Sequence, residues 1–229
     1  MNALINADNR RGGTLPPDTG FASRVNPEAN GSPAGVSVEY APDSGKQWYV
    51  LRVSYGRSER VGKLLAKRSI AYYLPMHTVV KLVNNKRRKV TEPLLPNLIF
   101  VHAEPDVLYD LVVNANPDRL MTYYYNHFKT DSFGKNPPLT IPERSMASFI
   151  KVTSSANENV RIISPRYCHF KSGDRVRVMG GEFEGVEGRV ARAAGQQRVI
   201  VELEGLCLIA TAYIPTGLLS TIPPAPASV

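Results

Sequence analysis

Residues 174–190 read DRVRVMGGEFEGVEGRV and decide the fold of the C-terminal part of the chain. Val176 and Val178 alternate with arginines, the period-2 pattern of a strand with one buried face, and Val186 begins a second run. The bend between the runs needs residues that tolerate positive φ, which glycine supplies. The glycines of this stretch are Gly180, Gly181, Gly185 and Gly188. The stretch therefore predicts a strand, a glycine-rich turn and a second strand.

This unit resembles the KOW motif, a small β-barrel found in transcription elongation factors and ribosomal proteins; an unrelated β-hairpin is the alternative. Further strand-like runs follow it, so we expect an all-β, SH3-like barrel over residues 170–222. Phe183 lies in the glycine-rich turn, where a barrel core cannot easily hold it. We therefore expect Phe183 to be exposed and to dock a partner.

The net charge of the chain is +8, and it is unevenly distributed. Residues 1–45 carry −2, residues 46–170 carry +10 and residues 171–229 carry 0. A polyanion partner is therefore expected at the middle segment and not at the barrel, although a basic surface that is merely solvated gives the same pattern.

Composition divides the chain into two domains. Residues 1–45 hold six glycines and five prolines, which predicts a disordered tail. An ordered α/β sandwich is expected over residues 46–153, followed by a linker over 154–169, the barrel, and a disordered tail over 223–229. The fold class is therefore α+β.

Alternating and helical apolar patterns divide the N-terminal domain into elements. Strands are expected at 46–53, 71–83 and 98–101, with helices over 57–68 and from Pro105 and Pro142. Residues 86–91 return from the Asn84-Asn85 turn as a β-hairpin. Residues 120–125 are expected to form a further strand, and residues 129–139 an exposed loop.

Together these features resemble the NusG family, in which an NGN domain that opens with Trp-Tyr precedes a KOW domain. Residues 92–101, EPLLPNLIFV, look more like the specialised RfaH-type proteins than like general NusG. Residues 123–128 and 134–142 further resemble UpxY-type antiterminators of polysaccharide operons. The resemblance implies an operon-specific antitermination factor that acts in the cytoplasm as a monomer.

The resemblance also implies a surface that binds the clamp helices of the largest subunit of RNA polymerase. A helix tip docks best into an apolar pocket with aromatic anchors. Core packing is the alternative for the aromatic residues of this set. The candidates are Trp48, Tyr49, Arg52, Leu95, Leu98 and Phe100.

Two basic elements are candidates for contact with upstream or non-template DNA. One is the outer face of the first helix and the other is the returning arm of the hairpin, where cations reach phosphates without being buried. The helix residues are Arg57, Arg60, Lys63 and Lys67, and the hairpin residues are Lys86, Arg87, Arg88 and Lys89.

By resemblance, the barrel would engage a small-subunit ribosomal protein or a termination factor. No catalytic constellation, cofactor motif, metal-ligand spacing or membrane span is recognisable in the sequence, so we expect a non-enzymatic protein without cofactor or metal. Two other functions stay open: a general NusG housekeeping factor, and a KOW-containing ribosome- or RNA-binding protein without polymerase contact.

Overall fold

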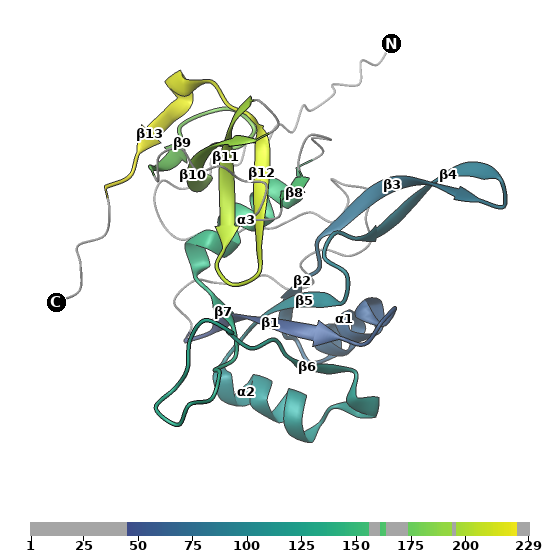
Figure 1. Cartoon of the computed structure of the whole chain (residues 1–229). Coiled ribbons are helices and arrows are strands. Elements are labelled where there is room, and N and C mark those ends of the chain that lie inside the picture. The colour runs from purple at the N-terminus through teal and green to yellow at the C-terminus, as the bar shows by residue number, and fades with distance from the viewer. Residues whose placement is uncertain (1–44, 156–160, 164–173, 194–195, 224–229) are drawn as a thin grey trace, which may run out of the picture.

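The computed structural model describes residues 45–155, 161–163, 174–193 and 196–223 (Figure 1). The two predicted tails lie outside the described residues apart from Gly45 and Pro223, and so does most of the predicted linker.

The first sheet is built around strand β1 (Gln47–Val53). Strand β5 (Leu98–Ala103) pairs with it on one side, and β2 (Ala71–Tyr73) pairs with β5 beyond. Strands β6 (Met121–Tyr123) and β7 (Thr140–Ile141) pair with successive parts of the other edge of β1. All these pairings are antiparallel, so the aromatic and β-branched run at the start of the domain is the centre of a sheet.

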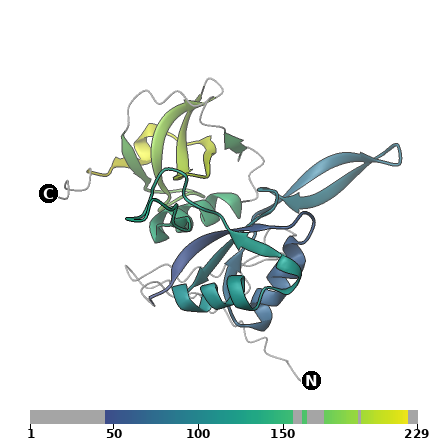
Figure 2. The same ribbon diagram turned by 60° about the horizontal axis from the view of Figure 1, so that its bottom comes forward.

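Helices cover both faces of this sheet (Figures 1 and 2). Helix α1 (Ser58–Lys67) and helix α2 (Pro105–Tyr109), which continues as a π-helical turn (Asp110–Asn114), lie on one face. Helix α3 (Glu143–Thr153) lies on the other face. The sheet and its helices therefore form the α/β sandwich expected for the N-terminal part of the chain.

Helix α1 packs closely because it carries a glycine in its middle. Val61 and Leu65 are fully buried, as the apolar spacing predicts. A Cβ at Gly62 would lie 3.0 Å from the ring of Tyr72, so the missing side chain lets β2 approach the helix.

A two-stranded ribbon projects from the first sheet in both views (Figures 1 and 2). It consists of β3 (Met76–Val83) and β4 (Lys86–Pro93), joined at Asn84 and Asn85, whose φ values of 50° and 58° suit a tight hairpin turn. The predicted continuous strand 71–83 is wrong, because β2 ends before Leu74-Pro75 and the chain then leaves the sheet.

The C-terminal strands form one antiparallel six-stranded sheet in the order β13-β9-β10-β11-β12-β8. Their bounds are β8 (Arg161–Ile163), β9 (Arg175–Val178), β10 (Glu187–Ala193), β11 (Gln196–Leu203), β12 (Cys207–Tyr213) and β13 (Leu219–Thr221). Short 3-10 turns occur at Pro117–Arg119 and Thr216–Leu218. Strand β8 comes from the segment predicted as linker, and its pairing with β12 makes it part of this sheet.

The glycine-rich turn is present where the sequence predicts it. Gly181 and Gly185 have φ values of 81° and 82°, which side chains rarely allow. Gly188 acts differently: a Cβ there would lie 2.4 Å from the carbonyl oxygen of Ile200 on the neighbouring strand β11. Glycine at that position therefore lets β10 and β11 pair closely.

Helix α3 lies between the first sheet and the C-terminal sheet (Figure 2). Most of its side chains from Met146 to Thr153 are buried, because the helix is covered on two sides and exposes little of its surface to solvent. One buried cluster includes Phe100 of the first sheet, Phe149 of α3 and Val199 of the C-terminal sheet. The apolar core thus continues from one sheet to the other through this helix.

Candidate functional site

The predicted polymerase surface is largely buried. Trp48 and Phe100 have no exposed side-chain area, and Tyr49 and Leu95 are 7% and 8% exposed. Tyr49 also faces the opposite side of the sheet from Trp48, because successive strand residues alternate in direction. The six candidates therefore do not form one exposed patch, and core packing describes the two largest aromatic residues.

Trp48 belongs to a polar cluster that fixes the start of α3. Glu143, in the first turn of that helix, accepts a hydrogen bond from Trp48 Nε1 at 3.1 Å and lies 2.9 Å from His102 Nε2. The rings of Trp48 and His102 are 4.9 Å apart. The sequence gives no sign that His102 belongs to this cluster, because only the pairing of β1 with β5 brings it beside Trp48.

An exposed margin of the same sheet face remains available. Arg52 and Leu98 are opposite one another on β1 and β5, with Arg52 exposed and Leu98 half-buried. The Arg52 guanidinium lies 5.5 Å from the centre of the Tyr124 ring, within the range of a cation–π contact. This margin offers an apolar side chain, an aromatic ring and a cation together, and we name it the β1 margin (Arg52, Leu98 and Tyr124).

The C-terminal sheet contacts α3 through polar as well as apolar groups. The backbone N–H of Glu187 donates to Ser148 Oγ at 3.0 Å, and Lys151 Nζ donates to the carbonyl oxygen of Glu184. At the β11–β12 turn, a Cβ at Gly205 would lie 3.5 Å from Leu139, the residue whose N–H bonds the Tyr124 carbonyl. The C-terminal sheet thus reaches the neighbourhood of the β1 margin.

Phe183 does not occupy the position expected for a docking residue. Its side chain is 6% exposed and belongs to the cluster that includes α3 and the first sheet. The prediction that Phe183 is exposed was wrong, because α3 covers the glycine-rich turn and buries a side chain that the barrel alone would leave exposed. The backbone of Val186 closes that turn by donating to the Phe183 carbonyl at 3.0 Å.

The basic face of α1 has the predicted exposure. All four cations are exposed and recur at helical spacing, so they share one side of the helix. Arg60 Nη2 lies 2.9 Å from Asp118 Oδ2, so part of its charge is already neutralised. Lys63 and Lys67 lie further along the same face. The set comprises Arg57, Arg60, Lys63 and Lys67.

The hairpin cations are exposed but do not form one surface. Lys86 and Arg88 share one face of the ribbon, and Arg87 and Lys89 share the other. Lys81 pairs with Glu92 near the base of the ribbon. The ribbon therefore presents positive charge on two faces, and the four consecutive cations cannot all contact a single flat surface.

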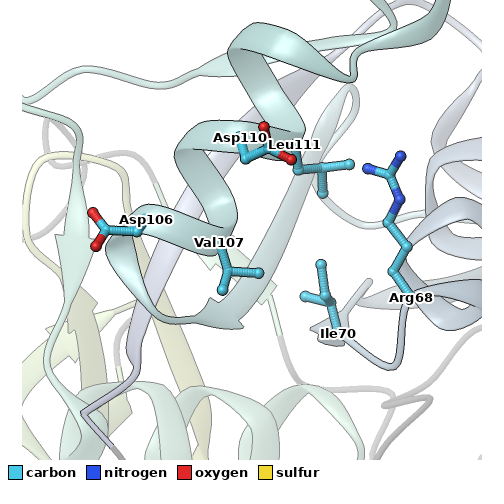
Figure 3. A pocket seen from close by; sticks show the side chains of 6 residues that line it. All are labelled: Arg68, Ile70, Asp106, Val107, Asp110 and Leu111. Carbon is cyan, nitrogen blue, oxygen red and sulfur yellow. The ribbon is translucent and has the colours of Figure 1, made fainter.

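A shallow pocket separates the end of α1 from α2 (Figure 3). Ile70, Val107 and Leu111 line it together with Arg68, Asp106 and Asp110. In Figure 3 the carboxylates of Asp106 and Asp110 point in different directions from their helix, so these two acids do not converge. Asp110 accepts a hydrogen bond from Asn114 at 3.0 Å. This geometry does not suit paired-carboxylate chemistry.

Tyrosine side chains gather beside α2. The rings of Tyr49 and Tyr123 are 6.2 Å apart, and those of Tyr123 and Tyr125 are 6.3 Å apart. Burial raises the pKa of Tyr123 to about 12, with smaller contributions from the neighbouring phenols. Burial also raises the pKa of Tyr49, and the nearby Asp106 adds to that rise. The phenols of Tyr49 and Tyr123 therefore stay neutral at physiological pH.

Within the described residues, no group of three or more His, Cys, Asp or Glu side chains is placed to hold a metal ion. No helix in the described ranges is long and apolar enough to cross a membrane.

A family model described as "NusG: Transcription termination factor nusG" matches residues 46–150. The match spans the first sheet, the projecting ribbon, α1, α2 and most of α3, and it ends before the C-terminal sheet. Over these residues, which are fewer than half of the chain, the protein is similar to the NusG family, whose members are transcription elongation or termination factors. Proteins of that family bind RNA polymerase and are not enzymes.

Proposed function

We propose that this protein is an operon-specific elongation factor that binds RNA polymerase and suppresses pausing and termination, acting as a cytoplasmic monomer at long polysaccharide-type operons. The observation that carries the proposal is the NusG family match over residues 46–150. The EPLLPNLIFV stretch, which resembles the RfaH-type proteins, supports the operon-specific form.

We propose the β1 margin as the part of the predicted polymerase surface that first meets the clamp helices. Trp48 and Phe100 support this surface from beneath, since Phe100 packs on Phe149 of α3 with ring centres 5.1 Å apart. Leu98 is half-buried within the margin, and Leu95, which packs in the same apolar cluster, is 8% exposed. Binding there would anchor an apolar helix tip on Leu98 and the Tyr124 ring.

We propose that the two basic elements contact nucleic acid at the same complex. The helix face, with Lys63 and Lys67 exposed, suits the phosphates of one strand. The ribbon carries cations on both faces and extends away from both sheets, which lets it reach DNA beside the polymerase (Figure 1). Neither element carries out covalent chemistry.

We propose that the C-terminal sheet forms the KOW barrel and binds a small-subunit ribosomal protein or a termination factor. Its balanced charge favours a protein partner over nucleic acid. Because Phe183 is buried against α3, a partner that uses this residue would have to separate the sheet from the helix.

The closest competing function is a general NusG housekeeping factor, which the same family match supports equally. Occupancy of the protein along the genome separates the two. The operon-specific function predicts signal over a few long operons, whereas signal over most transcribed genes would support the general factor. Pull-down of core RNA polymerase with the full chain tests the polymerase contact that both functions share.

A further inference from the structure

The loop between β6 and β7 has a backbone held in place by its own side chains. Asp131 Oδ1 accepts hydrogen bonds from the backbone N–H groups of Phe133 at 2.9 Å and Lys135 at 2.8 Å. The Asp131 N–H donates to the Lys135 carbonyl at 2.8 Å. The tip of the loop is therefore a closed turn whose only carboxylate is engaged internally.

The base of the same loop is fixed in a similar way. Asn126 Oδ1 accepts from the Phe128 N–H at 2.9 Å. Asn136 Nδ2 donates to the carbonyl oxygens of Asn126 at 2.7 Å and Lys129 at 2.9 Å. These bonds join the two arms of the loop, so the backbone is organised before any partner binds.

This organised backbone presents aromatic rings to solvent. Phe128 is 80% exposed, Phe133 is 84% exposed and Tyr125 is 45% exposed. A solvent-exposed phenylalanine side chain contributes little burial free energy to the stability of the fold. Two of them on one organised loop therefore indicate a binding role. The loop extends away from the first sheet, where a ligand can reach it (Figure 1).

The exposed rings are accompanied by cations. Among the described residues, neither Phe128 nor Phe133 lies in ring contact with another aromatic side chain, so neither ring is already stacked. Lys129 directly follows Phe128, and Lys135 lies two residues after Phe133; both lysines are exposed. The centres of protein interfaces are depleted of charged residues, whereas single-stranded nucleic acids bind to aromatic rings with nearby cations.

We propose that the loop of residues 125–135 binds single-stranded nucleic acid, with unpaired bases stacked on Phe128 and Phe133 and phosphates near Lys129 and Lys135. Every base has a π-face, so this contact tolerates any sequence. The site adds to the proposed function without resting on it, because it requires neither polymerase nor the projecting ribbon.

The test measures binding of the full chain to a short fluorescent oligonucleotide of mixed sequence, as single-stranded DNA, single-stranded RNA and duplex DNA. Phe128→Ala and Phe133→Ala are each expected to weaken single-strand binding by roughly 5- to 150-fold. Their salt dependence should stay unchanged, whereas Lys129→Gln and Lys135→Gln should each lower the salt slope by about 0.7. Comparison of the DNA and RNA arms identifies the strand that the loop prefers.

Tyr213→Ala provides the matched control, because it removes an aromatic side chain that is 58% exposed on the C-terminal sheet. It should leave all three affinities unchanged. Circular dichroism verifies that each variant is folded. Single-strand binding that survives removal of both phenylalanines would overturn the proposal and assign the rings to a protein partner. An equal loss for single-stranded and duplex DNA would also overturn it, because duplex bases are not available for stacking.

Discussion

Ser148 on α3 accepts a hydrogen bond from the backbone N–H of Glu187 at 3.0 Å, which ties the helix of the first domain to strand β10 of the C-terminal sheet. Ser148 is 5% exposed, so this bond is shielded from water. The same C-terminal sheet places Gly205 beside Leu139, whose N–H donates to the carbonyl of Tyr124 in the β1 margin. The position of the C-terminal sheet therefore affects how accessible the β1 margin is.

Replacement of Ser148 by Ala should loosen the contact between α3 and the C-terminal sheet. A buried N–H that loses its acceptor costs about 1–3 kcal/mol. Hydrogen exchange of the Glu187 amide should therefore accelerate, and the affinity for core polymerase should rise if the C-terminal sheet restricts the β1 margin. Ser145→Ala, on the same helix, is the control. Unchanged exchange at Glu187 in Ser148→Ala would contradict the importance of this bond.

Glu143→Ala should destabilise the first domain. It removes the acceptor that Trp48 Nε1 and His102 Nε2 share, which we expect to lower the free energy of unfolding by about 1–3 kcal/mol. Urea unfolding followed by Trp48 fluorescence measures the loss. Glu143→Gln keeps an acceptor oxygen and should lose less. Equal stability of the Ala variant and the wild type would show that the cluster is not structural.

Charge reversal on the ribbon should weaken DNA binding without unfolding the protein, since these cations are exposed. The two faces supply matched variants of equal charge change: Lys86→Glu with Arg88→Glu, and Arg87→Glu with Lys89→Glu. Each pair should lower duplex affinity and reduce the salt slope by roughly 2. If one pair has no effect, DNA contacts a single face; if neither has, the ribbon does not bind DNA.

Gly188→Ala should destabilise the C-terminal sheet, because the new methyl group would lie 2.4 Å from the Ile200 carbonyl oxygen and 2.8 Å from Val199 Cγ1. Overpacking of this kind costs about 1–3 kcal/mol. Thermal unfolding checks the loss. Gly217→Ala is the control, since nothing lies within 4 Å of the added atom. A melting temperature unchanged by Gly188→Ala would mean that β10 and β11 are further apart than described.

The raised pKa of Tyr123 predicts lower stability at high pH. The folded protein keeps the phenol proton to a pKa of about 12, whereas the unfolded chain releases it near the ordinary tyrosine pKa of 10.0. Between these values the folded state binds more protons, so the free energy of unfolding falls as pH rises. Tyr123→Phe should show a smaller fall, and chemical unfolding at several pH values measures both. Identical pH profiles would contradict the effect.

Most secondary-structure elements and the hairpin turn could be predicted from local sequence, with the strand 71–83 and β8 as exceptions. The Asn84-Asn85 pair predicted its turn because few residues other than glycine tolerate positive φ at two successive positions. Val176 and Val178 are buried between exposed arginines, as their alternation requires.

The exposure of the candidate site residues could not be predicted from local sequence, because it depends on contacts between segments that are distant in the chain. Trp48 and Tyr49 are consecutive and both apolar, and a strand necessarily places them on opposite faces. The burial of Phe183 depends on α3, which lies some distance earlier in the chain. Strand β8 has only three residues, which give too short a pattern to predict a strand within the linker.

Direct binding of the full chain to core RNA polymerase tests the central claim most closely, with Leu98→Asp in the β1 margin compared with Tyr213→Asp on the C-terminal sheet. A charge on Leu98 would lie against the apolar tip of the clamp helices, so Leu98→Asp should lose most of its affinity while Tyr213→Asp binds like the wild type. A full chain that does not bind polymerase, or a folded Leu98→Asp variant that binds as tightly as the wild type, would contradict the proposed function or its assigned surface, respectively.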